Sequence, residues 1–354
     1  MNKRLQRLQE KLAEHSLEAI LISQPANRRY ISGFSGSSGY LLVGREQAFL
    51  ITDFRYLEQA SQQAPDFEIR KAKENLAQSL APLLDETGWR QVAFEKNDLT
   101  YALYSELTQG TSVAWKPLAG LVEELRMIKD EQELAILRRG AAVTDAAFAH
   151  ILTMIKPGVT EQELSLELEY FMRRRGASRA SFRYIVASGP RGAMPHGTAS
   201  SKQLAAGELL TMDFGAVFDA YCTDITRTVC LGEPDEQQRR VYEVVLQAQQ
   251  EARARIRPGM TGREIDALAR NLIKEAGFDE QFGHGLGHGL GLEVHEEPRL
   301  APLSKTVLQP GMVITVEPGI YIPGWGGVRI EDMVLLTAEG AELLTHSPRE
   351  LIIV

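Results

Sequence analysis

The amino-acid sequence predicts a protein of mixed α and β structure (α/β, or α+β) that is divided into two domains of different construction. Its 354 residues exceed one typical domain of roughly 150 residues. Helix and strand signals alternate up to about residue 115, as in a compact α/β domain. The later sequence contains an internal repeat. We place the boundary between residues 118 and 128 and expect domains at 1–124 and 125–354.

The first domain begins with an amphipathic helix, because Leu5, Leu8 and Leu12 recur at helical spacing. Apolar strands are expected over Ala19–Ser23 and Tyr40–Val43. These elements support a compact α/β arrangement in this part of the chain.

A long helix and a repeat define the second domain. Asp130 can cap the helix, which we expect to run to the Pro-Gly pair at residues 157–158. Lys156–Ala177 and Arg257–Phe278 then share Pro-Gly, a Thr cap, a Glu at the third helical position and a closing glycine. Gly207–Gly215 parallels Gly311–Gly319 in the same order. This agreement favours one domain with a pseudo-two-fold axis over chance recurrence of capping signals.

Each repeat carries one acid at the end of an apolar strand and another on the returning strand. Pairing about a turn at residues 218–219 would place Asp213 opposite Asp224, with Cβ atoms about 5 Å apart. Glu317 and Glu331 flank a turn centred near Gly324. Carboxylates this close repel each other unless they are compensated. Four carboxylates balance two divalent cations, so the pattern predicts a dinuclear metal centre.

A glycine-rich segment supplies histidines at positions 284, 288 and 295. Its glycines disfavour an ordinary helix, so His284 and His288 are not the pair of a helical zinc motif. One histidine among carboxylates suits Mn²⁺, Co²⁺ or Zn²⁺ better than Cu. The remaining histidines, with His196 in a separate loop, are candidates for proton transfer or carbonyl polarisation. Each of these residues alone would be ordinary; the hypothesis depends on the whole set.

Together these motifs resemble the pita-bread metallopeptidases, in the aminopeptidase P and prolidase branch. The matching segments are Thr211–Gly215, Cys222–Arg227, His284–Glu296, Thr315–Gly319 and Arg329–Asp332. Asn27–Ser38 and Thr52–Ala60 resemble the family's smaller N-terminal domain. The resemblance therefore implies a small creatinase-like α/β domain at 1–124, followed by a pita-bread catalytic domain at 125–354 with a pseudo-two-fold repeat.

Carried over residue by residue, the resemblance implies two divalent metal ions held by Asp213, Asp224, His288, Glu317 and Glu331. Asp224 and Glu331 would bridge the ions, with Mn²⁺ expected and Co²⁺ or Zn²⁺ as alternatives. The resemblance makes His196, His284 and His295 catalytic or substrate-contacting. Glu317 would also move a proton, and Arg329 would orient a ligand carboxylate.

The implied reaction is hydrolysis of the bond between an N-terminal residue and a following proline, with the metals activating water for attack on the scissile carbonyl. An Xaa-Pro aminopeptidase is expected, and an Xaa-Pro dipeptidase (prolidase) is the alternative, because the segment Gly289–Glu293 also resembles bacterial prolidases. Related enzymes tolerate a small residue in place of proline. A more distant alternative is a non-catalytic pita-bread binding protein, which would typically have lost metal ligands.

Composition argues against several other classes. The balance of 39 basic and 47 acidic residues gives a net charge of −8, which disfavours a nucleic-acid partner. No apolar run is long enough to span a bilayer, and Cys222 and Cys230 are too few for a disulfide framework. The charged N-terminal helix has no apolar signal core, so we expect a cytoplasmic protein. The resemblance implies short peptides with proline, or a small residue, in second place as substrates, because the N-terminal domain would narrow access to the site. The resemblance alone implies a homodimer.

Overall fold

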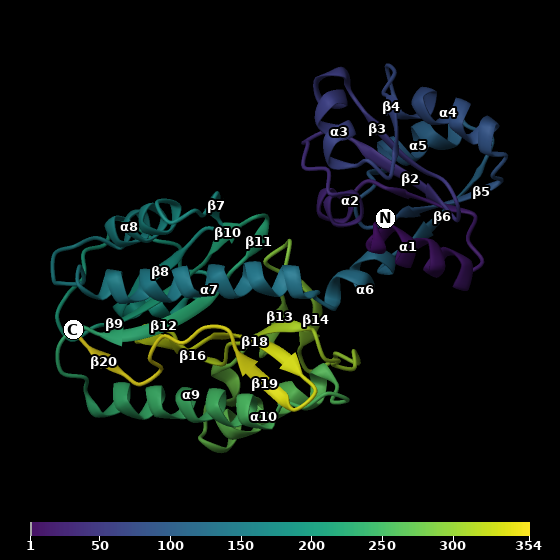
Figure 1. The fold of residues 1–354 in the computed structure, drawn as a ribbon. Helices are drawn as coiled ribbons and strands as arrows, with labels where there is room; N and C mark the ends of the chain where they lie inside the picture. The colour runs from purple at the N-terminus through teal and green to yellow at the C-terminus, as the bar shows by residue number, and fades with distance from the viewer. Residues whose placement is uncertain (1) are drawn as a thin grey trace. The chain divides into compact units, whose positions relative to one another are not determined.

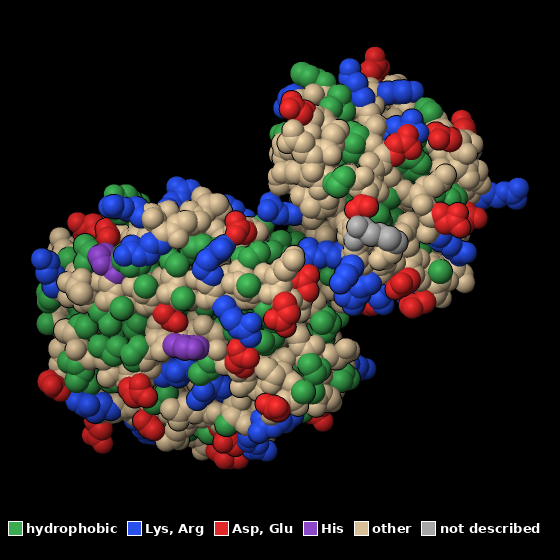
Figure 2. Space-filling view, viewed as in Figure 1, with side chains coloured by type: hydrophobic (Ala, Val, Ile, Leu, Met, Phe, Trp, Pro, Cys, Tyr) green, Lys and Arg blue, Asp and Glu red, His purple; other side chains and the backbone are tan. Residues whose placement is uncertain are grey.

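The computed structural model describes residues 2–354, and the chain divides into two compact units. The first unit ends at Arg126 and the second begins at Met127. Figure 1 shows that both units combine helices and strands, which confirms the predicted α/β (α+β) fold class. None of the helices in the described residues is long and apolar enough to cross a membrane. Figure 2 shows acidic and basic side chains interspersed over the visible face of each unit.

The first unit contains a six-stranded sheet in the order β4-β3-β2-β1-β5-β6. Its strands are β1 (Ala19–Ile22), β2 (Tyr40–Gly44), β3 (Ala48–Thr52), β4 (Glu68–Lys71), β5 (Gln91–Glu95) and β6 (Ala114–Leu118). Its helices are α1 (Lys3–Glu14), α2 (Pro25–Ser32), α3 (Leu57–Gln63), α4 (Leu76–Thr87), α5 (Tyr101–Gly110) and α6 (Leu121–Met127), the last of which ends at the unit boundary. The leucines predicted to line one face of α1 are all buried, and the two predicted strands are β1 and β2.

In the second unit, the strands lie between α7 and α8 on one side and α9 and α10 on the other (Figure 1). These helices are α7 (Glu131–Leu152), α8 (Glu161–Arg173), α9 (Glu236–Arg255) and α10 (Gly262–Glu275). Asp130 caps α7 with a capping box, as predicted. The helix ends before the predicted stop, because both the N–H and the hydroxyl of Thr153 bind the carbonyl of His150.

Short strands form four sheets in the second unit, ordered β11-β10-β7, β20-β12-β9-β8, β14-β13-β15-β18-β19 and β16-β17. The strands of the first half, with the C-terminal strand, are β7 (Arg179–Ala180), β8 (Ile185–Ser188), β9 (Leu209–Phe214), β10 (Ala216–Phe218), β11 (Tyr221–Cys222), β12 (Ile225–Cys230) and β20 (Ile352–Ile353). Those of the second half are β13 (Gly287–Gly289), β14 (Glu296–Leu300), β15 (Val313–Val316), β16 (Gly319–Ile322), β17 (Gly326–Arg329), β18 (Asp332–Thr337) and β19 (Gly340–Leu343).

The two copies of the repeat adopt the same local structure. Thr160 and Glu163 form a capping box on α8, and Thr261 and Glu264 form one on α10. Each capping threonine also forms an isolated antiparallel bridge to a later segment, at Gln203 and Val307 respectively. The sequence repeat is therefore a structural repeat that delivers equivalent strands to the same region.

The predicted strand register is wrong in the first repeat and correct in the second. Asp213 lies opposite Thr226 and not opposite Asp224. The hairpin turns at Asp219 and Ala220, both with positive φ, so the pairing shifts by two residues from the prediction. A shift of two keeps Asp224 on the same face of the sheet as Asp213. In the second repeat, the registers of β15–β18 and β16–β17 are both centred on residue 324, as predicted for Glu317 and Glu331.

Candidate metal centre

The structure brings all five predicted metal ligands to the wall of one cavity of about 710 Å³. Each ligand lies in a strand or next to a strand end: Asp213 in β9, Asp224 before β12, His288 in β13, Glu317 after β15 and Glu331 before β18. The predicted catalytic residues His196, His284, His295 and Arg329 line the same cavity. The structure therefore brings these residues of both repeat halves together around one cavity.

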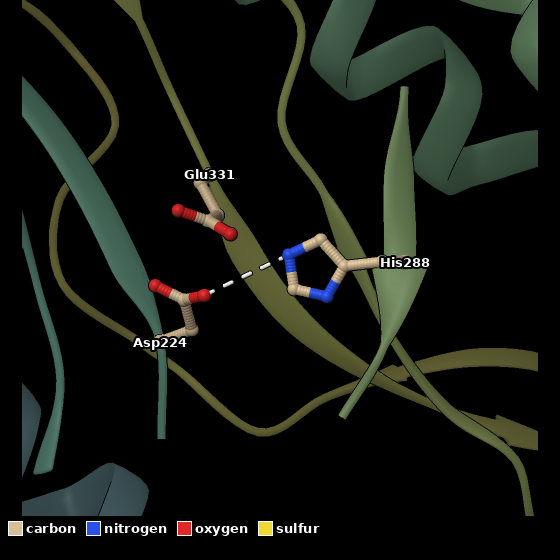
Figure 3. Close-up of side chains that lie close together, drawn as sticks. All are labelled: Asp224, His288 and Glu331. Atoms are coloured by element: carbon tan, nitrogen blue, oxygen red, sulfur yellow. Dashed lines mark ion pairs between the residues drawn. The ribbon is translucent and has the colours of Figure 1, made fainter. Parts of the chain in front are cut away.

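Three of the five predicted ligands are arranged closely enough to share one ion. Ligand atoms of Asp224, His288 and Glu331 all lie within 4.8 Å of one another. Figure 3 shows these side chains pointing toward one another from separate parts of the fold. The His288 Nε2 atom lies 3.8 Å from Asp224 Oδ2 and 3.3 Å from the Oε1 atom of Glu317. These distances leave the imidazole facing a group of carboxylate oxygens.

The carboxylates have unused acceptor capacity in a buried place. Asp213 Oδ1, Asp224 Oδ1 and Glu331 Oε1 are buried and make no hydrogen bond to any described residue. A buried charged oxygen without a partner is costly, and a divalent cation is the kind of partner that this set of oxygen and nitrogen donors fits. The residues present therefore suit a metal site.

The electrostatics of the protein without metal support the same conclusion. Burial, followed by the neighbouring carboxylates, raises the pKa of Asp224 and of Glu331 well above their ordinary values. Burial also raises the pKa of Glu317 to about 7, against the opposing charge of Arg329. Like charges held this close favour protonation unless a cation replaces the protons. The cluster is thus suited to exchange protons for metal ions.

His288 is held in the form that can bind a metal. Burial lowers its pKa to about 3, so the imidazole is neutral at pH 7. Its Nδ1 atom lies 3.0 Å from the carbonyl oxygen of Gly289, which can only accept a hydrogen bond. The proton therefore lies on Nδ1, and Nε2 presents its lone pair to the carboxylates.

Two threonines that were not predicted from the sequence donate hydrogen bonds to carboxylates of the predicted ligands. Thr226 donates to Glu331 Oε2 at 2.7 Å, and Thr315 donates to Glu317 Oε1 at 3.1 Å. Thr226 follows Asp224 by two residues and Thr315 precedes Glu317 by two. Residues two apart in a strand share a face, so this spacing is a signal that could have identified both hydroxyls.

Arg329 lies beside the carboxylate of Asp213, one of the predicted ligands. Its Nη2 atom donates to Asp213 Oδ2 at 2.6 Å, and its Nε atom donates to the Thr226 hydroxyl at 3.1 Å. Its Nη1 atom donates to the hydroxyl of Tyr321, a residue that sequence reasoning missed, at 2.7 Å. No local pattern marks Tyr321, because its partners come together only in the folded sheet.

The three remaining histidines differ in how their ring nitrogens are used. His284 uses both nitrogens, with Nδ1 2.7 Å from the Gly285 carbonyl oxygen and Nε2 2.9 Å from the Tyr321 hydroxyl. Burial lowers its pKa to about 4, so it is neutral. The ring nitrogens of His196 and His295 make no hydrogen bond to any described residue, and both side chains line the cavity. His295 also packs edge-to-face on His288, with ring centroids 4.4 Å apart.

Comparison with known proteins gives the family. Residues 135–338 match the model of metallopeptidase family M24, and residues 4–128 match the creatinase/prolidase N-terminal domain. The chain belongs to metallopeptidase family M24. This confirms the resemblance found in the sequence, and family membership implies a dinuclear metal site.

Several M24 relatives match this chain along nearly its whole length. An uncharacterized peptidase of Bacillus subtilis is 47% identical over 351 residues, with 99% of each chain covered. The structure of an Xaa-Pro dipeptidase from Bacillus anthracis matches with a TM-score of 0.97 and 48% identity, covering 99% of each chain. An X-Pro aminopeptidase from Thermotoga maritima matches with a TM-score of 0.91 and 38% identity, again covering 99% of each.

Two arginines add positive charge to the cavity of this M24 chain, and the sequence analysis did not single them out. Arg183 and Arg299 line the cavity, and their guanidinium groups make no hydrogen bond or ion pair to any residue that the structure describes. Arg299 lies directly opposite His288 in the β13–β14 pair, so the two side chains share a face. Free guanidinium groups in a cavity can bind a carboxylate.

Proposed function

We propose that this chain is a metal-dependent exopeptidase that hydrolyses the bond between an N-terminal residue and a following proline, with residues 125–354 as its catalytic domain. The observation that carries the proposal is the meeting of four carboxylates and one neutral imidazole, with unpaired buried oxygens, at the wall of a 710 Å³ cavity. The names of the relatives support the proline preference: an Xaa-Pro dipeptidase from Bacillus anthracis and an X-Pro aminopeptidase from Thermotoga maritima.

We assign the metal-ligand role to Asp213, Asp224, His288, Glu317 and Glu331, with Asp224 and Glu331 as the bridging residues. Three features support the assignment: the burial of all of these side chains except Glu317, the carboxylate oxygens that pair with no described residue, and the orientation of the imidazole. A set rich in carboxylate oxygen is hard, which favours Mn²⁺, with Co²⁺ or Zn²⁺ as alternatives. When bound, the two ions would activate water and polarise the scissile carbonyl.

The remaining groups have roles that their positions suggest. Glu317 lies at the cavity wall, where its carboxylate can take up the proton that the attacking water loses and pass it to the leaving proline nitrogen. The ring nitrogens of His196 and His295, which make no hydrogen bond within residues 2–354, can donate to the carbonyl oxygen as negative charge develops on it. Arg329 holds the Asp213 carboxylate, and His284, already bonded to Tyr321, shapes the cavity wall.

The charged groups of the cavity also bear on the length of the substrate. The sequence predicts an aminopeptidase, with a dipeptidase as the alternative. The guanidinium groups of Arg183 and Arg299, which pair with none of the described residues, favour the dipeptidase, because the proline of a dipeptide carries a carboxylate that the proline of a longer peptide lacks. We therefore propose that Xaa-Pro dipeptides are the preferred substrates.

The remaining parts of the proposal follow from the sequence and from the family resemblance. We propose a cytoplasmic homodimer without a nucleic-acid or membrane partner.

A pair of timed digests tests the activity and the substrate length together. Mn²⁺-loaded protein is incubated with Ala-Pro or Ala-Pro-Ala, and release of alanine is followed, with Ala-Ala as the control that lacks proline. Faster cleavage of Ala-Pro supports the dipeptidase, whereas faster cleavage of Ala-Pro-Ala supports the aminopeptidase. Equal cleavage of Ala-Ala would contradict the proline preference, and no cleavage by metal-loaded protein would contradict the activity.

A further inference from the structure

Glu161, the first residue of α8, lies under the loop that carries His196 and is 0% exposed. Its Oε1 atom accepts hydrogen bonds from the N–H of Ser188 (2.9 Å), the hydroxyl of Ser188 (3.0 Å) and Arg191 Nε (3.2 Å). Its Oε2 atom accepts from Arg191 Nε (3.0 Å), the N–H of Ser200 (3.0 Å) and the hydroxyl of Ser200 (2.7 Å). One carboxylate therefore ties together the two ends of the loop.

The same contacts extend to the residues next to His196. Arg191 Nη2 donates to the carbonyl oxygen of Thr198 at 2.6 Å, and the Thr198 N–H donates to the carbonyl oxygen of His196 at 2.8 Å. On the other side, Arg329 Nη1 donates to the carbonyl oxygen of Pro195 at 3.3 Å. The backbone on both sides of His196 is thus linked to a buried charged group, while the imidazole itself faces the cavity.

Capping of α8 does not explain the carboxylate of Glu161. Glu163 closes the capping box of α8, and its counterpart Glu264 does the same on α10. The counterpart of Glu161 in the second repeat is Gly262, the first residue of α10. The capping box of α10 therefore forms without a carboxylate at this position. A Cβ atom on Gly262 would lie 2.1 Å from the carbonyl oxygen of Arg299. The first helical position therefore meets a cavity-lining segment in both repeats.

We propose that Glu161 is a positioning residue for His196, which it fixes relative to the metal ligands through Arg191 and the two ends of the loop. The inference rests on the proposed function, in which His196 contacts the reacting carbonyl. A group displaced by about 1 Å from its productive place can lose about 100-fold in rate. Loss of the Glu161 charge should therefore slow the reaction without removing a metal ligand.

The test compares Glu161→Gln with Glu163→Gln, a control on the same helix that removes only the capping carboxylate. Glu161→Gln is expected to lower kcat for Ala-Pro by about 10- to 100-fold, with KM changed less than about threefold and two metals retained. Adding Glu161→Gln to His196→Ala should cause no further loss, because both changes remove the same function. A kcat equal to that of Glu163→Gln, multiplied losses in the double variant, or full activity in His196→Ala would each overturn the inference.

Hydrogen exchange gives a second readout that needs no turnover. Glu161→Gln should speed exchange over residues 189–200 and leave β9 unchanged, whereas unchanged exchange in the loop would overturn the inference. If Glu161→Gln does not fold, Arg191→Lys is the replacement test. Arg191 is partly exposed, and a lysine there keeps the positive charge but cannot contact Glu161 and the Thr198 carbonyl oxygen at the same time. If the proposed function is wrong, wild-type protein would bind metal without cutting Ala-Pro. Hydrogen exchange over residues 189–200 would still decide whether Glu161 holds the loop.

Discussion

Replacing Arg329 by methionine should destabilise the metal-free protein and weaken metal binding. The side chain is buried and donates to Asp213, Thr226, Tyr321 and the carbonyl oxygen of Pro195. The substitution leaves the Asp213 carboxylate buried without this ion pair. Removing one partner of a buried ion pair costs about 3–5 kcal/mol in the free energy of unfolding. For a unit of this size, that cost corresponds to a fall in Tm of about 6–20 °C.

The positioning of Asp213 should matter for metal affinity as well. Groups that orient metal ligands typically contribute about 10- to 100-fold to affinity or activity. Thermal melts in EDTA and calorimetric titration with Mn²⁺ measure the two effects on the same samples. Arg138→Met is the matched control, because Arg138 pairs with Glu342 at the surface and should contribute less than about 1 kcal/mol. An Arg329→Met variant that melts within about 2 °C of wild type and binds Mn²⁺ equally well would refute the reasoning.

Three further predictions concern metal loading, substrate choice and the cavity wall. In the metal-free protein the pKa of Glu317 is raised to about 7, while that of His288 is lowered to about 3. Metal must therefore displace protons from carboxylates and not from the imidazole. Mn²⁺ affinity should fall as the pH drops below about 7. Calorimetry in buffers of different ionisation enthalpy would detect the released protons, and a constant affinity from pH 5.5 to 7.5 would argue against the mechanism. Arg299→Met should raise KM for Ala-Pro by about 10- to 100-fold through loss of a charge-assisted hydrogen bond; an equal effect on Ala-Pro-Ala amide would exclude carboxylate recognition. Tyr321→Phe should cost about 1–3 kcal/mol in urea unfolding, since it leaves buried polar partners unpaired, with two metals still bound; an unchanged midpoint would contradict the described bonds.

Much of the site could be predicted because its signals are local in the sequence. Acids at the ends of apolar strands, repeated with the same capping pattern, place Asp213 and Glu317 in equivalent positions without knowledge of the fold. The first register was wrong because the hairpin turns at Asp219 and Ala220, and no glycine marks the positive φ values. The face of the sheet was still correct, since a shift of two residues preserves it.

The groups that orient the site were harder to predict, because their partners are distant in the sequence. Tyr321 meets His284 and Arg329 only after β16 and β17 pair. Glu161 lies next to a capping signal that draws attention to Glu163, and its own contacts are to a loop about 30 to 40 residues further on. Hydrogen bonds of this kind depend on tertiary structure and not on periodicity.

The central claim is that five residues of this chain hold two divalent ions that the activity requires. Metal content per chain, measured by mass spectrometry after Mn²⁺ loading and desalting, tests it most directly in wild type and in Asp224→Asn. We expect two ions per wild-type chain, and loss of both metal loading and Ala-Pro cleavage in the variant, because Asp224 is buried among the carboxylates and is assigned to both ions. A wild-type chain that retains no metal, or an Asp224→Asn variant with two ions and full activity, would contradict the account.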